Sequence, residues 1–578
     1  MRSSAELSPA RTESRDRLIK RTADEGPCPA VQRDPIETQK AVAEAITQLI
    51  RDGAPESGQL DALVALEREA QPAIERLLIQ YVEGDAQVAA FEWKVWHCAL
   101  RLTQSLFQAN DHFLWHRRDA ADGEWRKHEP VLLAQLFHHR KIEFLLRFLR
   151  YKKRSSELWR QLHEMYRCAR ERGLPDRCDA GGASDGKGRT TGEFEQQYLQ
   201  ILLLEAMNSG RFSPREGLWA YRWFARWCSA PGLQLAQLED CARIAPTGFV
   251  VDPSGSDGLR RALSNERMPQ GNLLHLDSSP LRAMIDQASA SLRDGATTAL
   301  PHQLTAAVRA GQIALLNKLS ILFAPTPVDV ERRAERKPVA LAVQAIVGFP
   351  YIVEELCKNA QKPSEAMLSA ADAGSENTLS PSGRPTFSPI LSADASPMSL
   401  SLTGASDPIP QIWQVKDRSD SGCRMRGQID NLNRVIPGAL IAVRDSETAP
   451  WIVSVVRWFR RLMVDYVEIG VEYLGREPRF VKLVTDGERN LAVVDGPSLA
   501  SRCFAALYLP PSEEFPTLPI KTLLLPAREF RPDAEVTLLS SNATYRLRLA
   551  EPIQQQYEYV WTSFAVIAKM APPPAGID

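Results

Sequence analysis

Residues 332–347 read RRAERKPVALAVQAIV, a short basic segment that leads into a run of alternating apolar positions. Side chains of a strand alternate between two faces, so the apolar residues from Val339 to Val347 share one face. The same period of two returns in Val467–Tyr473, where glutamates and a glycine lie opposite the apolar set. The region after about residue 331 therefore predicts an antiparallel sheet or barrel.

The residues before this region follow a helical period instead. Apolar residues recur at spacings of three and four from about residue 39 to residue 325, for example at Leu60 and Leu63. The change comes near Ala324–Pro327, and one short extended piece, Leu273–Asp277, interrupts the helical pattern. The sequence thus predicts an α+β multidomain protein. An all-α N-terminal region is followed by an antiparallel β-barrel and a second C-terminal β domain.

Composition divides the chain further. Residues 1–38 are polar and lack periodicity, and residues of about 358–410 are rich in Ser and Pro, so both segments are predicted to be disordered. We place a helical domain at 39–325, the barrel at 331–478 with the second disordered segment as an insertion, and the C-terminal β domain at 485–574. Candidate strands of this last domain are 491–494, 504–509, 520–525, 536–539 and 544–549. The sequence leaves open whether they form a second barrel or extend the first.

The overall composition excludes several classes of protein. The 578 residues carry 70 Lys and Arg against 71 Asp and Glu, so the net charge of −1 gives no basic footprint for a nucleic acid polymer. No apolar run reaches the ~18 residues that span a bilayer, and the N-terminus lacks a secretory signal. The nine cysteines are scattered without a CxxC pair, as in a protein with reduced thiols. We therefore expect a cytoplasmic protein without a transmembrane segment.

Two short motifs carry the candidate chemistry. Arg332 and Arg336 form an RxxxR pattern directly before the first strand, and Asp417, Ser419 and Gly422 form a DxSxxG pattern after a later one. Arginine forks bind phosphate oxygens in pairs and stack on aromatic bases, while a carboxylate accepts the N–H pair of a guanine edge. A small hydroxyl and a glycine let the backbone approach a ligand closely. Together the motifs suit a guanine nucleotide with exposed phosphates, without a P-loop.

An RxxxR pattern, a strand and then a (D/N)xSxxG pattern resembles the PilZ domain family. The segments Pro437–Leu440, Val455–Trp458 and Ile469–Leu474 resemble the later strands of that family. The resemblance covers residues of about 331–478. It implies a six-stranded β-barrel that binds the bacterial second messenger cyclic di-GMP.

The resemblance also implies a role for each motif residue. Arg332 and Arg336 would clamp phosphates and stack on guanine, while Asp417, Ser419 and Gly422 would hold the other face of the ligand on the barrel surface. The two motifs lie 81 positions apart, more than the family usually shows, and the predicted insertion accounts for most of the excess.

Two neighbouring features leave alternatives open. Arg333 and Lys337 are also four residues apart, but we favour the register of Arg332 and Arg336 because lysine lacks the planar fork. Arg424 and Arg426 alternate out of the strand after the second motif. They either extend the anion site or are ordinary charges on a sheet surface.

The helical region has three features of its own. Trp219, Trp223 and Trp227 fall on one helix face, where they form a groove for a protein partner or, as we favour, part of the core. The basic run His138–Lys141 is typical of a solvated helix face. His163–Arg167 begins like the zinc-binding pattern HExxH but has arginine in place of the second ligand, so no metal site is predicted.

The sequence is compatible with three functions. The favoured one is a receptor that couples cyclic di-GMP to an unidentified protein partner, in motility, pili or surface adhesion, as the resemblance implies. The alternatives are a scaffold with a degenerate barrel that binds no ligand, and an enzyme with a regulatory barrel. The chain lacks P-loop, dinucleotide-binding and kinase motifs, and the GG(D/E)EF, EAL and HD-GYP signatures. We therefore expect no enzymatic activity and no cofactor.

Overall fold

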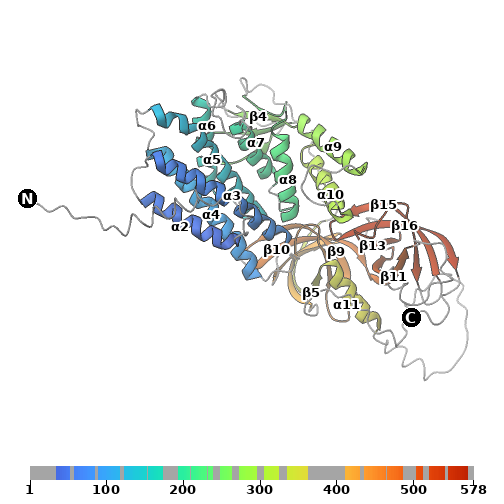
Figure 1. The fold of residues 1–578 in the computed structure, drawn as a ribbon. Helices are drawn as coiled ribbons and strands as arrows, with labels where there is room; N and C mark the ends of the chain where they lie inside the picture. Colours follow the sequence, from blue (N-terminus) through green and yellow to red (C-terminus); the bar gives the residue numbers. More distant parts are fainter. Residues whose placement is uncertain are drawn as a thin grey trace, which may run out of the picture.

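The structure is a computed structural model of the chain (Figure 1). It shows a helical N-terminal region followed by two closed six-stranded antiparallel barrels, which confirms the predicted fold class. In Figure 1 the helices of the N-terminal region, coloured blue to green, lie at one end of the molecule, and the barrels, orange and red, lie at the other with α11 (Phe349–Gln361) beside them. The residues that the structure describes are 34–51, 57–84, 89–116, 123–152, 154–172, 193–207, 210–230, 232–237, 248–262, 273–295, 305–324, 335–361, 410–429, 435–463, 465–485, 503–511, 520–539 and 544–570.

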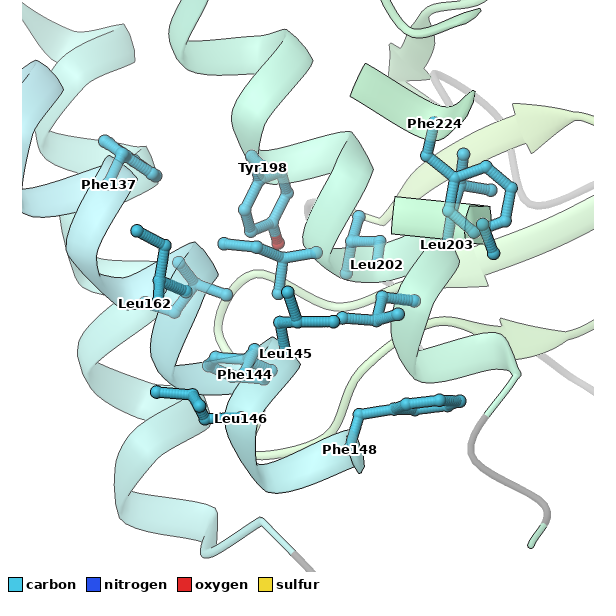
Figure 2. Packing of buried hydrophobic residues seen from close by; sticks show 14 of the residues in the cluster. Phe137, Phe144, Leu145, Leu146, Phe148, Leu162, Tyr198, Leu202, Leu203 and Phe224 are labelled. Atoms are coloured by element: carbon cyan, nitrogen blue, oxygen red, sulfur yellow. The ribbon is translucent and has the colours of Figure 1, made fainter. Parts of the chain in front are cut away.

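The helical region packs around one large hydrophobic core. Figure 2 shows Phe144, Leu162, Tyr198 and Phe224, which four different helices contribute to this core. The positions that face this core recur at three and four residues, which is the period that buries one stripe of a helix. The helices are α2 (Pro35–Arg51), α3 (Ser57–Glu83), α4 (Ala89–His116), α5 (Gly123–Leu149), α6 (Ser156–Glu171), α7 (Glu193–Ala206), α8 (Pro214–Trp227), α9 (Ser279–Arg293) and α10 (Ala306–Leu322).

The tryptophan face of α8 belongs to this core. Trp219, Trp223 and Trp227 are buried, so the core interpretation is confirmed and the groove for a partner is not formed by these side chains. The helix begins at a capping box, in which Ser213 accepts from the backbone N–H of Glu216 and the Glu216 carboxylate accepts from that of Ser213. Two otherwise unpaired N–H groups are thereby satisfied at a buried helix end.

The basic run on α5 lies inside the bundle rather than on its surface. His139, Arg140 and Lys141 are buried, so the predicted solvated face is wrong. Arg140 donates to Glu143 at 2.7 Å and lies over the ring of Phe107, 3.8 Å from its centroid. A buried charge of this kind is tolerated because it is paired and packed on an aromatic face.

A four-stranded sheet of order β1-β4-β2-β3 interrupts the helical region. Its strands are β1 (Leu235–Gln237), β2 (Gly248–Val251), β3 (Arg260–Arg261) and β4 (Leu274–Asp277). The predicted extended piece at Leu273–Asp277 corresponds to β4. The other strands have two to four residues, which is too short to show a period in the sequence.

His163 of α6 joins this sheet region to the helices. Its Nδ1 lies 2.8 Å from the hydroxyl of Tyr198, and its Nε2 lies 2.9 Å from the carbonyl oxygen of Asp257. A carbonyl only accepts, so Nε2 carries the proton and the Tyr198 hydroxyl donates to Nδ1. The residue is thus a buried structural link.

The burial of His163 predicts a pH effect on stability. Desolvation lowers the pKa of His163 below its ordinary value of 6.5, so the neutral ring is favoured in the folded protein. This contribution to stability is complete above pH 6.5 and is lost as the pH falls through the folded pKa. We expect the thermal midpoint to fall less between pH 7.5 and 5.5 in His163→Gln than in the unmodified protein. The control His138→Gln should keep the original slope, and equal slopes in all three proteins would contradict the prediction.

The first barrel has the strand order β10-β7-β6-β5-β8-β9. Val343, Trp413, Met425 and Ile469 fill its interior. Its strands are β5 (Lys337–Val347), β6 (Gln411–Ser419), β7 (Gly422–Gln428), β8 (Leu440–Arg444), β9 (Ile452–Arg461) and β10 (Tyr466–Arg476).

A helix that the sequence did not predict, α11 (Phe349–Gln361), follows β5 after Gly348, whose φ is 99°. The first residues of the predicted insertion, 358–361, belong to this helix. The remainder of the insertion lies outside the described residues. The same holds for most of the predicted N-terminal tail, of which residues 35–38 already belong to α2.

The C-terminal β segment forms a second closed barrel, of order β11-β12-β13-β16-β15-β14. The predicted strands 504–509, 520–525, 536–539 and 544–549 correspond to β12–β15, whereas β11 and β16 were not predicted and 491–494 lies outside the described residues. The strands are β11 (Arg479–Thr485), β12 (Cys503–Leu509), β13 (Thr522–Pro526), β14 (Glu535–Leu539), β15 (Thr544–Gln555) and β16 (Tyr559–Met570). None of the helices within the described ranges has both the length and the apolarity needed to cross a bilayer.

The helical region contacts the first barrel through the end of β9. The backbone N–H of Phe459 donates to the carbonyl of Gly210 at 2.8 Å, and the ring of Phe459 lies 4.5 Å from that of Tyr151. Tyr151 also packs against the interior of the barrel. The helical region therefore closes one end of the first barrel with an aromatic side chain.

The second barrel contacts both other parts. Arg215 of α8 lies over the ring of Tyr557, 3.8 Å from its centroid. The two barrels share a hydrophobic cluster that includes Trp451 of the first and Leu507 and Tyr559 of the second. The first barrel is thus fixed from two sides.

Candidate functional site

A β-bulge decides where the second motif points. Trp413 and Val415 of β6 face the interior of the barrel, and unbroken alternation would turn Asp417 inward as well. Instead Val415 pairs with Met425 and Asp417 pairs with Arg424, so Lys416 is an extra residue. A bulge re-aims the side chains that follow it. Asp417 consequently shares the outer face of the barrel with Arg424.

Asp417 holds two arginines on this outer face. Arg336 Nη1 donates to Asp417 Oδ1 at 3.0 Å, and Arg424 Nε lies 2.7 Å from Asp417 Oδ2. The Asp417 side chain is 13% exposed, whereas those of Arg336 and Arg424 are 33% and 39% exposed. A nearly buried carboxylate therefore presents two guanidinium groups to solvent, with an excess of positive charge that favours an anion.

The next outward-facing row repeats the arrangement. Arg426 Nε donates to Glu468 Oε1 at 2.7 Å, and the side chains are 37% and 4% exposed respectively. Both carboxylates lie beneath their arginines, which fixes the guanidinium positions before any ligand arrives. That Arg424 and Arg426 extend an anion site stays a prediction.

The rest of the second motif forms the tight connection between β6 and β7. Ser419 Oγ donates to the carbonyl of Gly422 at 3.2 Å and lies 3.4 Å from Ser421 Oγ. Gly422 is buried against β10, where a Cβ would overlap the carbonyl oxygen of Val471. The glycine of the motif is therefore required by strand packing, whatever else it does.

Arg418, between the acidic and hydroxyl residues of the motif, is held away from Asp417. Its Nη1 and Nη2 donate to the two carboxylate oxygens of Asp445 at 2.9 and 2.6 Å. These hydrogen bonds lower the pKa of Asp445 and raise that of Arg418. The pair braces β6 against the segment after β8 and fixes the start of the motif turn.

The structure brings part of the predicted site together. Arg336 contacts Asp417, and Ser419 and Gly422 lie in the adjoining turn. Arg332 lies outside the described residues, so its placement stays a prediction. Lys337, the partner in the second possible register, is exposed at the start of β5.

Sequence reasoning missed Asp445 as the partner of Arg418. No motif marks this residue, and only the pairing of β5 with both β6 and β8 brings the two side chains together. The apolar run of β8 just before Asp445 is the one signal in the sequence that a strand ends there. Within the described residues, no cluster of three or more side chains is suited to hold a metal ion.

Comparison with known proteins finds a similarity for the first part of the helical region. Residues 31–238 match the family model described as the N-terminal domain of the cyclic-di-GMP receptor FimW. The matched residues run from just before α2 to just after β1, and the candidate site on the first barrel lies beyond them. No curated protein and no solved structure matched the chain.

Proposed function

We propose that the protein is a non-enzymatic receptor for cyclic di-GMP, and that the outer face of the first barrel binds the ligand. Two independent observations support this proposal. Residues 31–238 match the model of a domain of a cyclic-di-GMP receptor. Separately, the barrel has six strands, Arg336 of the first pattern directly precedes β5, and the second pattern lies where β6, the partner of β5, turns into β7. The barrel is accordingly proposed to be a PilZ domain.

The observation that carries the proposal is the contact between the two motifs. Arg336 and Asp417 are 81 residues apart in the chain, yet their side chains are 3.0 Å apart. A guanidinium beside a carboxylate offers a donor fork for a phosphate and an acceptor pair for a guanine edge within one site. We propose that Arg332 joins Arg336 on the phosphates, and that Ser419 and Gly422 border the ligand at the motif turn.

The position of the site suggests how ligand binding affects the contact between the barrel and the helical region. Arg336 lies at the junction between the helical region and the first strand of the barrel. Strand β7 of the site is joined through β10 to β9, whose Phe459 contacts Gly210 and Tyr151. A ligand that draws Arg336 away from Asp417 would bias this docking by its differential affinity for the two arrangements. The helical region is proposed to contact a protein partner, in motility, pili or surface adhesion.

Calorimetric titration with cyclic di-GMP tests the proposed function. We expect saturable binding to the full chain, and an affinity reduced about 30-fold or more by Arg336→Ala and by Asp417→Ala. Each substitution removes charge-assisted hydrogen bonds worth about 1.5–3 kcal/mol. Far-UV circular dichroism of both variants establishes that the barrels still fold.

The matched control is Arg548→Ala on the second barrel. Arg548 is likewise a partly exposed arginine paired with a carboxylate, Glu535, at 2.9 Å, so this variant changes the net charge by the same amount as Arg336→Ala. It should bind like the unmodified chain. Absence of binding by the unmodified chain would favour the alternative, a scaffold with a degenerate barrel. Equal binding by all variants would place the ligand elsewhere.

A further inference from the structure

A tryptophan lies on the same outer face as the two motifs. Along one row of the barrel wall, Asp417 pairs with Arg424, Arg424 pairs with Gly470, and Gly470 pairs with Trp458. Residues directly opposite each other in an antiparallel ladder project to the same side of the sheet. The row therefore runs from the second motif across β7 and β10 to Trp458 on β9.

A second bulge gives Trp458 this orientation. Gly470 pairs with Trp458 while Val471 pairs with Val456, so Arg457 is an extra residue in β9. Phe459, the next residue, belongs to the interior core of the barrel. Trp458 is accordingly turned to the outer face, and it is half-buried there.

Gly470 shows where the indole lies. A Cβ on Gly470 would overlap the Nε1, Cε2 and Cδ1 atoms of Trp458, so the ring covers the backbone of β10 at this point. The ring therefore extends from β9 across β10 in the direction of β7. The half-buried indole therefore lies next to β7, the strand that carries Arg424 and Arg426.

These arginines are partly exposed, with side chains 39% and 37% accessible. Arg424 and Arg426 each face a carboxylate with Nε, at 2.7 Å, which is the nitrogen nearest the main chain. The two Nη groups of each lie farther along the side chain, and these are the groups that grip a phosphate in pairs.

We propose that Trp458 is a stacking platform for one guanine ring of the ligand, and that Arg424 binds the adjoining phosphate. This inference rests on the proposed function and extends its site from two strands to four. Neighbouring strands lie about 4.8 Å apart, so Trp458 and Arg424 are separated by about 10 Å. A cyclic dinucleotide has two nucleosides joined through their riboses by two phosphodiesters, so Arg336 serves one base and its phosphate while Trp458 serves the other base.

Titration of four variants with cyclic di-GMP tests the inference. We expect Trp458→Leu to weaken binding about tenfold or more, because stacking of a base on an aromatic ring is lost. Trp458→Phe should retain most of the affinity, since a phenyl face still stacks. Arg424→Gln should weaken binding about tenfold as well. The control Trp93→Leu removes a tryptophan of α4 that is 40% exposed and far along the chain, and it should bind normally.

The outcomes separate the inference from the proposed function. If the unmodified chain binds and Arg336→Ala does not, while Trp458→Leu binds within twofold, the platform is wrong and the receptor proposal stands. If the unmodified chain does not bind cyclic di-GMP, both are overturned. Thermal unfolding of Trp458→Leu is measured alongside, and an affinity loss shared equally by Trp458→Phe and Trp458→Leu would also count against stacking.

Discussion

Glu92→Gln is expected to destabilise the protein by about 3–5 kcal/mol, although it changes only one atom of a helix side chain. Glu92 of α4 and Arg150 are nearly inaccessible, with side chains 1% and 2% exposed and 3.3 Å between Oε1 and Nη1. The carboxylate of Glu92 also attracts Arg461, the last residue of β9 in the first barrel. Burial and the neighbouring Arg150 lower the pKa of Arg461 to about 10. Neutralising Glu92 would leave two guanidinium groups to repel each other in a buried site.

The loss of stability affects the contact between the helical region and the first barrel, because Glu92 and Arg150 belong to the helical region and Arg461 belongs to the barrel. We therefore expect Glu92→Gln to open this contact, seen as faster limited proteolysis and a lower denaturation midpoint. The double variant Glu92→Gln/Arg461→Met should recover part of the loss, since one of the two positive charges is gone. Glu354→Gln is the control, because Glu354 forms an exposed pair with Lys358 on α11 and should change stability by only about 0.5 kcal/mol. No recovery in the double variant would contradict the charge argument.

The fold class could be predicted because the two periods are long enough to read. The helical spacing from residue 39 onward and the alternation of Val339–Val347 persist over many residues, and each buries one face. Of the small sheet, only the strand at Leu273–Asp277 was predicted. The other three strands are too short for a period of two to be recognised in the sequence. The basic run His138–Lys141 was wrongly predicted to be a solvated helix face, because hydrophilic sequence ordinarily lies at a surface. Inside the bundle, however, Arg140 donates to Glu143 and packs on the ring of Phe107.

The sequence predicts which residues make up the candidate site but not how these residues are arranged. The motifs name Arg336 and Asp417, yet their contact depends on an extra residue, Lys416, that turns Asp417 to the outer face. A bulge is a property of paired strands and leaves no mark in one of them. The same reasoning applies to Trp458, which the second bulge places beside the arginines of β7. Side-chain contacts of this kind can be recognised only when the register of the paired strands is known.

Gly422→Ala is expected to destabilise the first barrel by about 3 kcal/mol, the upper end of the cost of overpacking. The reason is that the added Cβ would meet the carbonyl oxygen and carbon of Val471, which are backbone atoms of the paired strand β10. A side chain at this distance could turn aside, but backbone atoms within a ladder cannot do so without breaking the pairing. Binding of cyclic di-GMP should be lost together with the barrel.

The effect of Gly422→Ala would separate two roles of the DxSxxG pattern, namely strand packing and ligand binding. Ser419→Ala removes a hydroxyl that donates to Gly422, so we expect weaker ligand binding with a stability loss of only about 1 kcal/mol. Gly58→Ala is the control for adding a methyl group, because nothing lies within 4 Å of the Cβ it creates in α3, and it should not destabilise the protein. A Gly422→Ala variant with unchanged unfolding but abolished binding would show that the glycine serves the ligand alone. Loss of the barrel would instead mean that the last residue of the motif fixes the strand pair from which Arg424 and Asp417 project. In that case a barrel that no longer binds a ligand would still need the glycine. Arg336 and Asp417 together would then indicate a receptor better than Gly422 does.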